Sequence, residues 1–387
     1  MVITIVCDVL GAENNGTTIT AKRLIDNLRA RGHRVKVVSP MKVEGDPDYF
    51  TTDLRHFGPF DSYIRVKNGV ELAKPDKEML YNAIQGSDVV HILLPFKMGI
   101  AAEKVAAELG VPTTSACHCQ AENITAHVKM QNFEPLNNYI YHRFYRRFYK
   151  RQRFIHCPTQ FIANELKRNG YGMDLRVISN GVAPQYHKND AVKPEALKDK
   201  FCILTVGRLA NEKRHDLLID AIKLSKYEKD IQLIIAGMGP LQKQTEKRAE
   251  GLTNPPMIGY HDKSELVDIM NYSDLYVHPA DIEIEAIACL EALTCGMVPI
   301  ISDSKKSATN HFALHECNLF KAGDPADLAK KIDYMIEHPA EKAALQAEYE
   351  EYSKQFRIAY CIDMMEKMFR DAIEDYKNNP PVKNQEE

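Results

Sequence analysis

The sequence predicts an α/β fold with two doubly wound halves, each a parallel sheet with helices on both faces. Three observations support this prediction. Strand-like and helix-like segments alternate along the first half, the alternation begins again near Phe201, and residues 180–194 between the halves are rich in Pro, Gly and Asn. The length of 387 residues fits two domains or one large one.

The first half begins with "VITIVCDVLG", a short apolar run that predicts a buried strand. It lacks the basic segment of a signal peptide. Apolar runs bounded by turn residues predict the further strands, and longer amphipathic stretches predict the helices between them. The strands are expected at 2–11, 33–40, 87–95, 111–118 and 153–161, and the helices at 16–32 and 97–110.

The second half repeats this alternation. Its strands are expected at 201–209, 231–237, 274–280 and 297–302, and its helices at 214–225, 264–273 and 285–296. A last long helix, about 355–377, carries apolar residues at helical spacing, and the tail 379–387 is expected to be disordered. Ligands of parallel sheets bind at the carboxyl ends of the strands, so functional residues should lie in the loops that follow strands.

The composition argues against several classes of protein. A net charge of -3 argues against a general nucleic-acid binder. No run of about 18 apolar residues predicts a membrane span. Nine scattered cysteines fit reduced thiols in a cytoplasm. The "CHC" at 117–119 matches no common zinc spacing, and "DPD" at 46–48 lies in a polar loop, so we expect no metal and full activity in chelator.

Two segments that follow strands offer positive groups. The glycine-containing "LGAENNGTT", at 10–18, opens a helix and can present backbone N–H groups to an anion, although a plain turn explains it equally well. In "TVGRLANEKRHD", Arg208 and Lys213 flank a strand-to-helix turn and together can neutralise a diphosphate. The alternative for Lys213 is a solvated position on the next helix.

Two acids occur eight residues apart in "DIEIEAIACLEALTCG". Glu283 is expected in the loop before a helix, where it could also simply complement the helix dipole. Glu291 is expected inside that helix among apolar neighbours. A buried carboxylate there needs a hydrogen-bond donor, which a sugar hydroxyl would supply.

Five segments, in order and spacing, resemble the retaining glycosyltransferases of family four, whose GT-B fold has two facing Rossmann-like domains. They are "GAENNG…LIDNLRARGHRVKVVSP", "VISNGV", "VGRLANEK", "MIGYHDKSEL" and "EIEAIACLEALTCGMVPI". The resemblance covers nearly the whole chain. It implies an N-terminal domain of residues 1–183, joined by a C-terminal helix at 356–378 that returns to it, and a nucleotide-sugar-binding domain of residues 184–355.

The resemblance also implies roles for residues of the donor site. Arg208 and Lys213 would hold the donor diphosphate, which the backbone at Gly16 and Gly207 would approach. Glu291 would bind the nucleotide ribose.

Other roles implied by the resemblance concern the transferred sugar. Glu283 would hold its hydroxyls, helped by the backbone of Ile284, Glu285 and Ala286. His118 would lie near the reacting sugar, although a histidine packed beside two cysteines is the alternative. The sequence departs from the family at 284–286, where many members carry a Phe-Gly pair; Glu285 adds a carboxylate there, which is expected to alter recognition of the sugar. Retention implies same-face attack, with the leaving phosphate as base and no cofactor.

The segment "YIYHRFYRRFYKRQRF", residues 139–154, holds six Lys or Arg and no acid. On one helix its aromatic side chains would share one side and five cations the other: Arg143, Arg146, Arg147, Lys150 and Arg153. The aromatic side is expected to pack on the first sheet, which disfavours base stacking on nucleic acid. The basic side is either a footprint for an anionic membrane or an ordinary solvated face.

A narrower resemblance, in "DIEIEAIACLEA" and "SDSKKSATNHFAL", is to bacterial membrane-glycolipid synthases that glycosylate diacylglycerol or ceramide. It implies transfer of a hexose from UDP-glucose or UDP-galactose to such a lipid, forming an alpha-glycolipid, at the inner face of the cell membrane. Three alternatives stay open: a soluble or polyprenyl-linked glycan acceptor, a nucleotide-sugar epimerase of the same architecture, and a binding module with a degenerate site.

Overall fold

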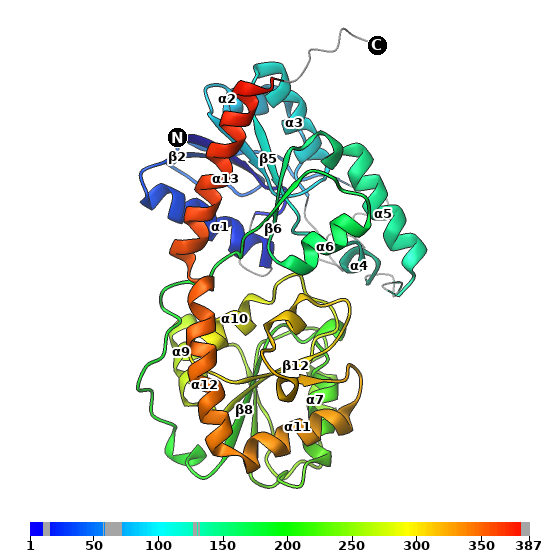
Figure 1. Ribbon diagram of the computed structural model, residues 1–387, viewed down its shortest axis with the longest axis vertical. Coiled ribbons are helices and arrows are strands. Elements are labelled where there is room, and N and C mark those ends of the chain that lie inside the picture. Colours follow the sequence, from blue (N-terminus) through cyan, green and yellow to red (C-terminus); the bar gives the residue numbers. More distant parts are fainter. Residues whose placement is uncertain (11–15, 57, 59–71, 127–129, 131, 381–387) are drawn as a thin grey trace. The chain divides into compact units, whose positions relative to one another are not determined.

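The computed structural model describes residues 1–10, 16–56, 58, 72–126, 130 and 132–380. The chain forms two compact units: unit 1 contains Met1–Asn180 together with Cys361–Glu387, and unit 2 contains Gly181–Tyr360 (Figure 1). Each unit is built on a parallel sheet with flanking helices, so the predicted fold class is confirmed. Most of the tail predicted to be disordered, from residue 381, lies outside the described residues.

The sheet of unit 1 has seven parallel strands in the order β3-β2-β1-β4-β5-β6-β7. Helices cover both faces, so the central strands β1 and β4 are buried along nearly their whole length. The strands are β1 Val2–Val6, β2 Arg34–Ser39, β3 Tyr49–Thr51, β4 Val89–Ile92, β5 Thr113–Ala116, β6 Phe154–Cys157 and β7 Asp174–Val177. The helices are α1 Gly16–Ala30, α2 Lys77–Ile84, α3 Lys97–Leu109, α4 Ala121–Ala126, α5 Glu134–Arg147 and α6 Gln160–Arg168.

The C-terminal helix, α13 (Ile358–Asn378), packs against unit 1, as predicted. One side of the helix is apolar and buried, and the ring centroid of Phe369 lies 5.3 Å from that of His91 on β4. Acidic side chains of α13 form ion pairs with basic side chains of the unit: Glu366 with His33 at 3.0 Å, Asp371 with Arg176 at 2.7 Å and Asp375 with Arg153 at 2.5 Å.

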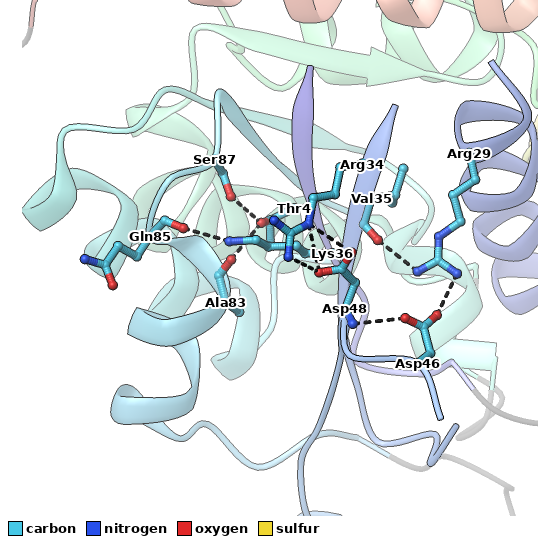
Figure 2. Close-up of polar contacts among 10 residues, drawn as sticks. All are labelled: Thr4, Arg29, Arg34, Val35, Lys36, Asp46, Asp48, Ala83, Gln85 and Ser87. Atoms are coloured by element: carbon cyan, nitrogen blue, oxygen red, sulfur yellow. Dashed lines mark hydrogen bonds and ion pairs between the residues drawn. The ribbon is translucent and has the colours of Figure 1, made fainter. Parts of the chain in front are cut away.

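A paired polar network fixes the segments around β2 (Figure 2). Arg34 forms a bidentate ion pair with Asp48, with N–O distances of 3.0 and 2.8 Å. The largely buried Lys36 donates to the carbonyl of Gln85, at the C-terminal end of α2, at 2.7 Å. These charged side chains have partners inside unit 1, and their contacts anchor α2 and the segment before β3. No ligand is needed to account for their positions.

The sheet of unit 2 has six parallel strands in the order β10-β9-β8-β11-β12-β13. The strands are β8 Phe201–Val206, β9 Ile231–Ala236, β10 Met257–Gly259, β11 Leu275–His278, β12 Pro299–Ser302 and β13 Leu319–Phe320. The helices are α7 His215–Leu224, α8 Gln242–Arg248, α9 Lys263–Tyr272, α10 Ile287–Thr294, α11 Pro325–Glu337 and α12 Pro339–Ser353. One continuous hydrophobic cluster joins the sheet to these helices.

Glycine permits a close approach of two loops at the carboxyl edge of this sheet. A Cβ atom at Gly237, after β9, would lie 2.0 Å from the carbonyl oxygen of Gly207, after β8. Only glycine can occupy position 237 without displacing that loop. The position of the loop after β8 therefore depends on the residue type at 237.

The prediction of one helix over residues 139–154 is wrong. Helix α5 ends at Arg147, a 3-10 turn spans Tyr149–Arg151, and Phe154 begins strand β6. The tertiary structure breaks the helix because Phe148 and Tyr149 are buried, and the Tyr149 hydroxyl donates to the carbonyl of Ala116 at 2.9 Å. Arg153 consequently lies off the helix, at the ion pair with Asp375.

Candidate active site

The loop after β8 carries the first group of predicted site residues. Gly207 and Arg208 follow the strand directly, and Lys213 ends a short 3-10 turn, Asn211–Lys213, before α7. The aliphatic part of Lys213 lies over Gly207, because its Cδ is 3.5 Å from the place where a Cβ at 207 would stand. The Arg208 side chain is 57% exposed, with one contact to Glu212 at 3.5 Å. Its guanidinium is therefore accessible to an anion from solvent.

The structure brings Lys213 and Glu283 together as an ion pair, from two segments 70 residues apart in the chain. The Glu283 side chain is only 12% exposed, and its Oε1 also lies 3.3 Å from Nε2 of His278. Burial raises the pKa of the Glu283 carboxyl, but Lys213 and His278 outweigh burial and lower that pKa to about 2. Glu283 is therefore an ionised, largely buried acceptor at neutral pH.

The backbone of the Glu283 loop is held from two sides. The carbonyl of Glu283 accepts the N–H of Ala308 at 2.9 Å. On the other side, the N–H of Asp281 donates to the carbonyl of Glu212 at 2.8 Å, and the Asp281 carboxylate pairs with Arg214 at 3.0 Å. These contacts fix the backbone at Glu283 before any ligand binds, as is expected of a preorganised binding site.

Helix α10 begins where the sequence departs from the family pattern. Glu283 lies in the loop before this helix and Glu291 inside it, as expected from the sequence. Glu285 and Glu291 are buried, and Ile284 is partly buried. Ala286, at the N-cap, has a φ of 56°, in the left-handed region that disfavours residues with a Cβ.

His118 and Gly16 belong to unit 1, whereas the other predicted catalytic and donor-binding residues belong to unit 2. His118 follows β5, is 7% exposed, and its ring lies edge-on to that of His156 at 5.4 Å. Burial, and then His156, lowers the pKa of His118 to about 3, so the ring is neutral. Gly16 is the first residue of α1, and most of the predicted glycine-containing loop before it, residues 11–15, lies outside the described residues.

Sequence reasoning missed Asp8, which follows β1 at the same sheet edge as His118. Both of its carboxylate oxygens are buried and make no hydrogen bond in the described structure. Burial raises the pKa of Asp8 to about 7. An acid directly after an apolar strand was the available signal.

Tyr276 and His278 on β11 were also missed, because a lone histidine in an apolar strand is usually a core residue. Both are buried, and His278 contacts Glu283. The two-residue period of a strand places them on one face, which was the available signal. In the described part of the chain, no group of three or more His, Cys, Asp or Glu is arranged to hold a metal ion.

Two parallel-sheet units, one of which carries paired basic and acidic groups after its strands, are the arrangement of glycosyltransferases with a GT-B fold. Two family models match the chain: "Glycosyltransferase Family 4" over residues 14–186 and "Glycosyl transferases group 1" over residues 187–356. The chain belongs to the retaining glycosyltransferases of family four, as the motifs predicted, and transfers a sugar from a nucleotide donor. This membership sets aside the epimerase alternative.

Characterised relatives are distant. The alpha-monoglucosyldiacylglycerol synthase of Acholeplasma laidlawii is 24% identical over 315 residues, which cover 74% of this chain and 76% of that protein. The GDP-mannose-dependent alpha-(1-6)-phosphatidylinositol dimannoside mannosyltransferase of Mycobacterium tuberculosis is 26% identical over 192 residues, 47% of this chain and 49% of that protein. These relatives glycosylate lipids according to their names.

Solved structures support the fold. Anabaena HepE, solved with UDP and glucose, has a TM-score of 0.70 at 15% identity and covers 96% of this chain and 100% of that chain. The sucrose-phosphate synthase of Thermosynechococcus elongatus has a TM-score of 0.72 at 16% identity and covers 96% of this chain and 99% of that chain. At these identities the similarity shows the GT-B fold alone.

Proposed function

We propose that this glycosyltransferase moves a hexose from UDP-glucose or UDP-galactose to a membrane lipid, diacylglycerol or ceramide, and forms an alpha-glycolipid at the cytoplasmic face of the membrane. The names of the lipid-glycosylating relatives support a lipid acceptor. The observation that carries the proposal is a cationic strip on unit 1, which we call the α5 surface.

The α5 surface consists of Arg143, Arg146, Arg147 and Lys150, with Tyr139 at one end. Their spacing places the four cations on one side of α5 and of the turn that follows it, and all four are exposed. None of them forms an ion pair with a described residue. Each cation would contribute about 1 kcal/mol near an anionic leaflet.

Exposed aromatic side chains at the N-cap of α5 and within the helix favour a membrane over a soluble anion. Tyr139 is 58% exposed and Phe133, at the N-cap, is 50% exposed. Such rings prefer the interface between water and lipid. No helix in the described ranges has the length and apolarity to cross a bilayer, so the proposed attachment is peripheral. Arg153, predicted as a fifth membrane contact, already pairs with Asp375.

The proposed donor chemistry uses the charges after β8 and β11. Arg208 and Lys213 bind the diphosphate and stabilise the negative charge that grows on the leaving phosphate as the sugar departs. Glu283 accepts hydrogen bonds from sugar hydroxyls, and Glu291 binds the ribose. The proposal keeps His118 near the sugar as a neutral imidazole, and the backbone at Gly16 near the diphosphate.

The function is tested by offering the purified protein UDP-glucose, UDP-galactose and GDP-mannose, with diacylglycerol or ceramide in anionic vesicles. GDP-mannose is included because several relatives are named for it. We expect release of nucleoside diphosphate that depends on the lipid, together with labelled alpha-glycolipid, and the same rate in chelator. Donor turnover on a soluble or polyprenyl-linked glycan, without glycolipid, would contradict the lipid acceptor and favour that alternative.

The α5 surface is tested by vesicle flotation. We expect the triple variant R146E/R147E/K150E to bind anionic vesicles at least about 100-fold more weakly, since three cations are lost at about 1 kcal/mol each and three repelling charges are added. The matched control reverses three exposed cations of unit 2, Lys229, Lys243 and Lys247, with the same change in net charge. Equal weakening in both variants would mean that net charge alone governs binding, and unchanged binding of the first variant would make α5 an ordinary solvated face.

A further inference from the structure

Two buried side chains of β11 extend the polar contacts of Glu283 into the core of unit 2. The rings of Tyr276 and His278 are stacked, with centroids 6.0 Å apart and an interplanar angle of 22°. The Tyr276 hydroxyl lies 3.2 Å from Nδ1 of His278, and Nε2 of the same ring lies 3.3 Å from Oε1 of Glu283. The three side chains form one continuous polar line that ends at Glu283.

The donor and acceptor roles of these three side chains follow from Glu283 at one end and Tyr276 at the other. The Glu283 carboxylate is ionised and can only accept, so the imidazole presents Nε2–H to it. Nδ1 is then the acceptor for the Tyr276 hydroxyl. Burial raises the pKa of Tyr276 well above its ordinary value, so the hydroxyl keeps the proton that it donates. Tyr276 thereby fixes the His278 tautomer that suits Glu283.

Lys213 and His278 compete for the same oxygen of Glu283. The Lys213 ammonium makes the ion pair, while the His278 N–H, at 3.3 Å, lacks the alignment of a full hydrogen bond. Contacts of this kind tighten when a ligand rearranges the site. A diphosphate that attracts the Lys213 ammonium removes the cation from a largely buried carboxylate, which then needs another donor.

We propose that His278 is a positioning residue for the donor sugar. When Lys213 turns to the diphosphate, the His278 N–H takes over Glu283 Oε1 and keeps the carboxylate oriented toward a sugar hydroxyl. This inference rests on the proposed function, because it assigns the diphosphate to Lys213 and the sugar to Glu283. His278 and Tyr276 would thus orient the Glu283 carboxylate, a role beyond packing in the core of unit 2.

The test compares His278→Gln with His278→Leu in the full-length protein. Gln can place an amide N–H near the position of Nε2, whereas Leu has no donor. Calorimetric titrations with UDP-glucose and with UDP give the extra affinity that the sugar provides. We expect H278L to lose roughly 10- to 100-fold of that extra affinity, because the lost hydrogen bond is made to a charged group. Binding of UDP itself should be unchanged. H278Q should retain most of the extra affinity.

His33→Leu is the matched control. Nε2 of His33 lies 3.0 Å from Oε1 of Glu366, a similar histidine–glutamate contact in unit 1. H33L should leave both affinities unchanged. If H278L keeps the full preference for UDP-glucose over UDP, or loses affinity for both equally, the proposal is wrong. If H278L does not fold, Tyr276→Phe replaces it: a smaller loss for UDP-glucose alone supports the proposal, and no loss overturns it.

A second measurement separates this inference from the identity of the donor. Wild-type protein that binds neither nucleotide contradicts the proposed donor, and the inference is then tested without ligand. In a Lys213→Met background, His278 is the remaining donor at Glu283 Oε1 among the described contacts. There, H278L should lower the urea midpoint of unfolding more than H278Q does. Equal midpoints for the two variants would overturn the role of His278.

Discussion

Replacing Lys213 by methionine removes the cation from Glu283 and keeps the aliphatic chain that lies over Gly207. The Glu283 side chain is 12% exposed, so the carboxylate left behind is poorly hydrated. Lys213 and His278 together outweigh burial and lower its pKa from 4.5 to about 2, so the carboxylate stays charged at pH 7 when Lys213 is removed, and breaking a buried pair in this way costs about 3 to 5 kcal/mol. We therefore expect K213M to lower the free energy of unfolding at pH 7 by about 3 to 5 kcal/mol.

The assay is a double-mutant cycle with Glu283→Gln, measured by urea unfolding and followed by circular dichroism. In the E283Q background the carboxylate is absent, so K213M should cost much less. The sign with pH follows from the lowered pKa: this stabilisation is fully present above about pH 4.5 and is lost as the pH falls through about 2.

Arg248→Met is the control for the loss of an ion pair in the same unit. Arg248 and Asp220 are 49% and 28% exposed, so breaking their contact should cost less than about 1 kcal/mol. The reasoning is refuted if K213M costs the same in the wild-type and E283Q backgrounds, because the two charges would then not be coupled.

Three further predictions concern stability. Ala286→Gly should raise the free energy of unfolding by about 1 kcal/mol, because glycine relieves the left-handed backbone at that N-cap; an unchanged urea midpoint would contradict this. Gly237→Ala should destabilise unit 2 and weaken binding of UDP, because its Cβ would meet the Gly207 carbonyl at 2.0 Å, and calorimetry checks the binding. Stability should also fall as the pH drops from about 6.5 toward 4, because the unfolded chain then binds protons that three buried histidines of unit 1 reject. Asp8, with its pKa raised to about 7, opposes this trend, but it is one group against three. A urea series across this range checks it, and a slope that His156→Gln leaves unchanged would count against the assignment to His91, His118 and His156.

Local patterns were sufficient for much of the fold. Short apolar runs such as that of β9 indicate buried strands, and amphipathic stretches such as that of α13 indicate helices. The alternation of strands and helices, and with it the second sheet, could therefore be predicted. Short edge strands, including β3 and β10, were missed, because three residues carry too little pattern. The motifs also placed Glu283 before α10 and Glu291 within it.

The α5 segment shows where local pattern fails. Helical spacing alone continues past Arg147, and only burial of Phe148 and Tyr149 against the sheet ends the helix there. The prediction that four of the cations are exposed to solvent still holds, because an exposed charge is hydrated and needs no ion-pair partner. Arg153 does not remain with them, since α13 supplies Asp375 from more than 200 residues away.

The sequence by itself determined the two-sheet architecture, the family and the residue types that a nucleotide sugar requires, because these depend on short-range periodicity and on motifs read in order. The tertiary structure decided which of those groups meet. The Lys213–Glu283 pair joins two loops 70 residues apart, and His278 reaches Glu283 from a strand that reads as ordinary core. The physical reason is that the charge state and orientation of a buried carboxylate depend on the donors that folding brings to it, and chain spacing does not reveal those donors.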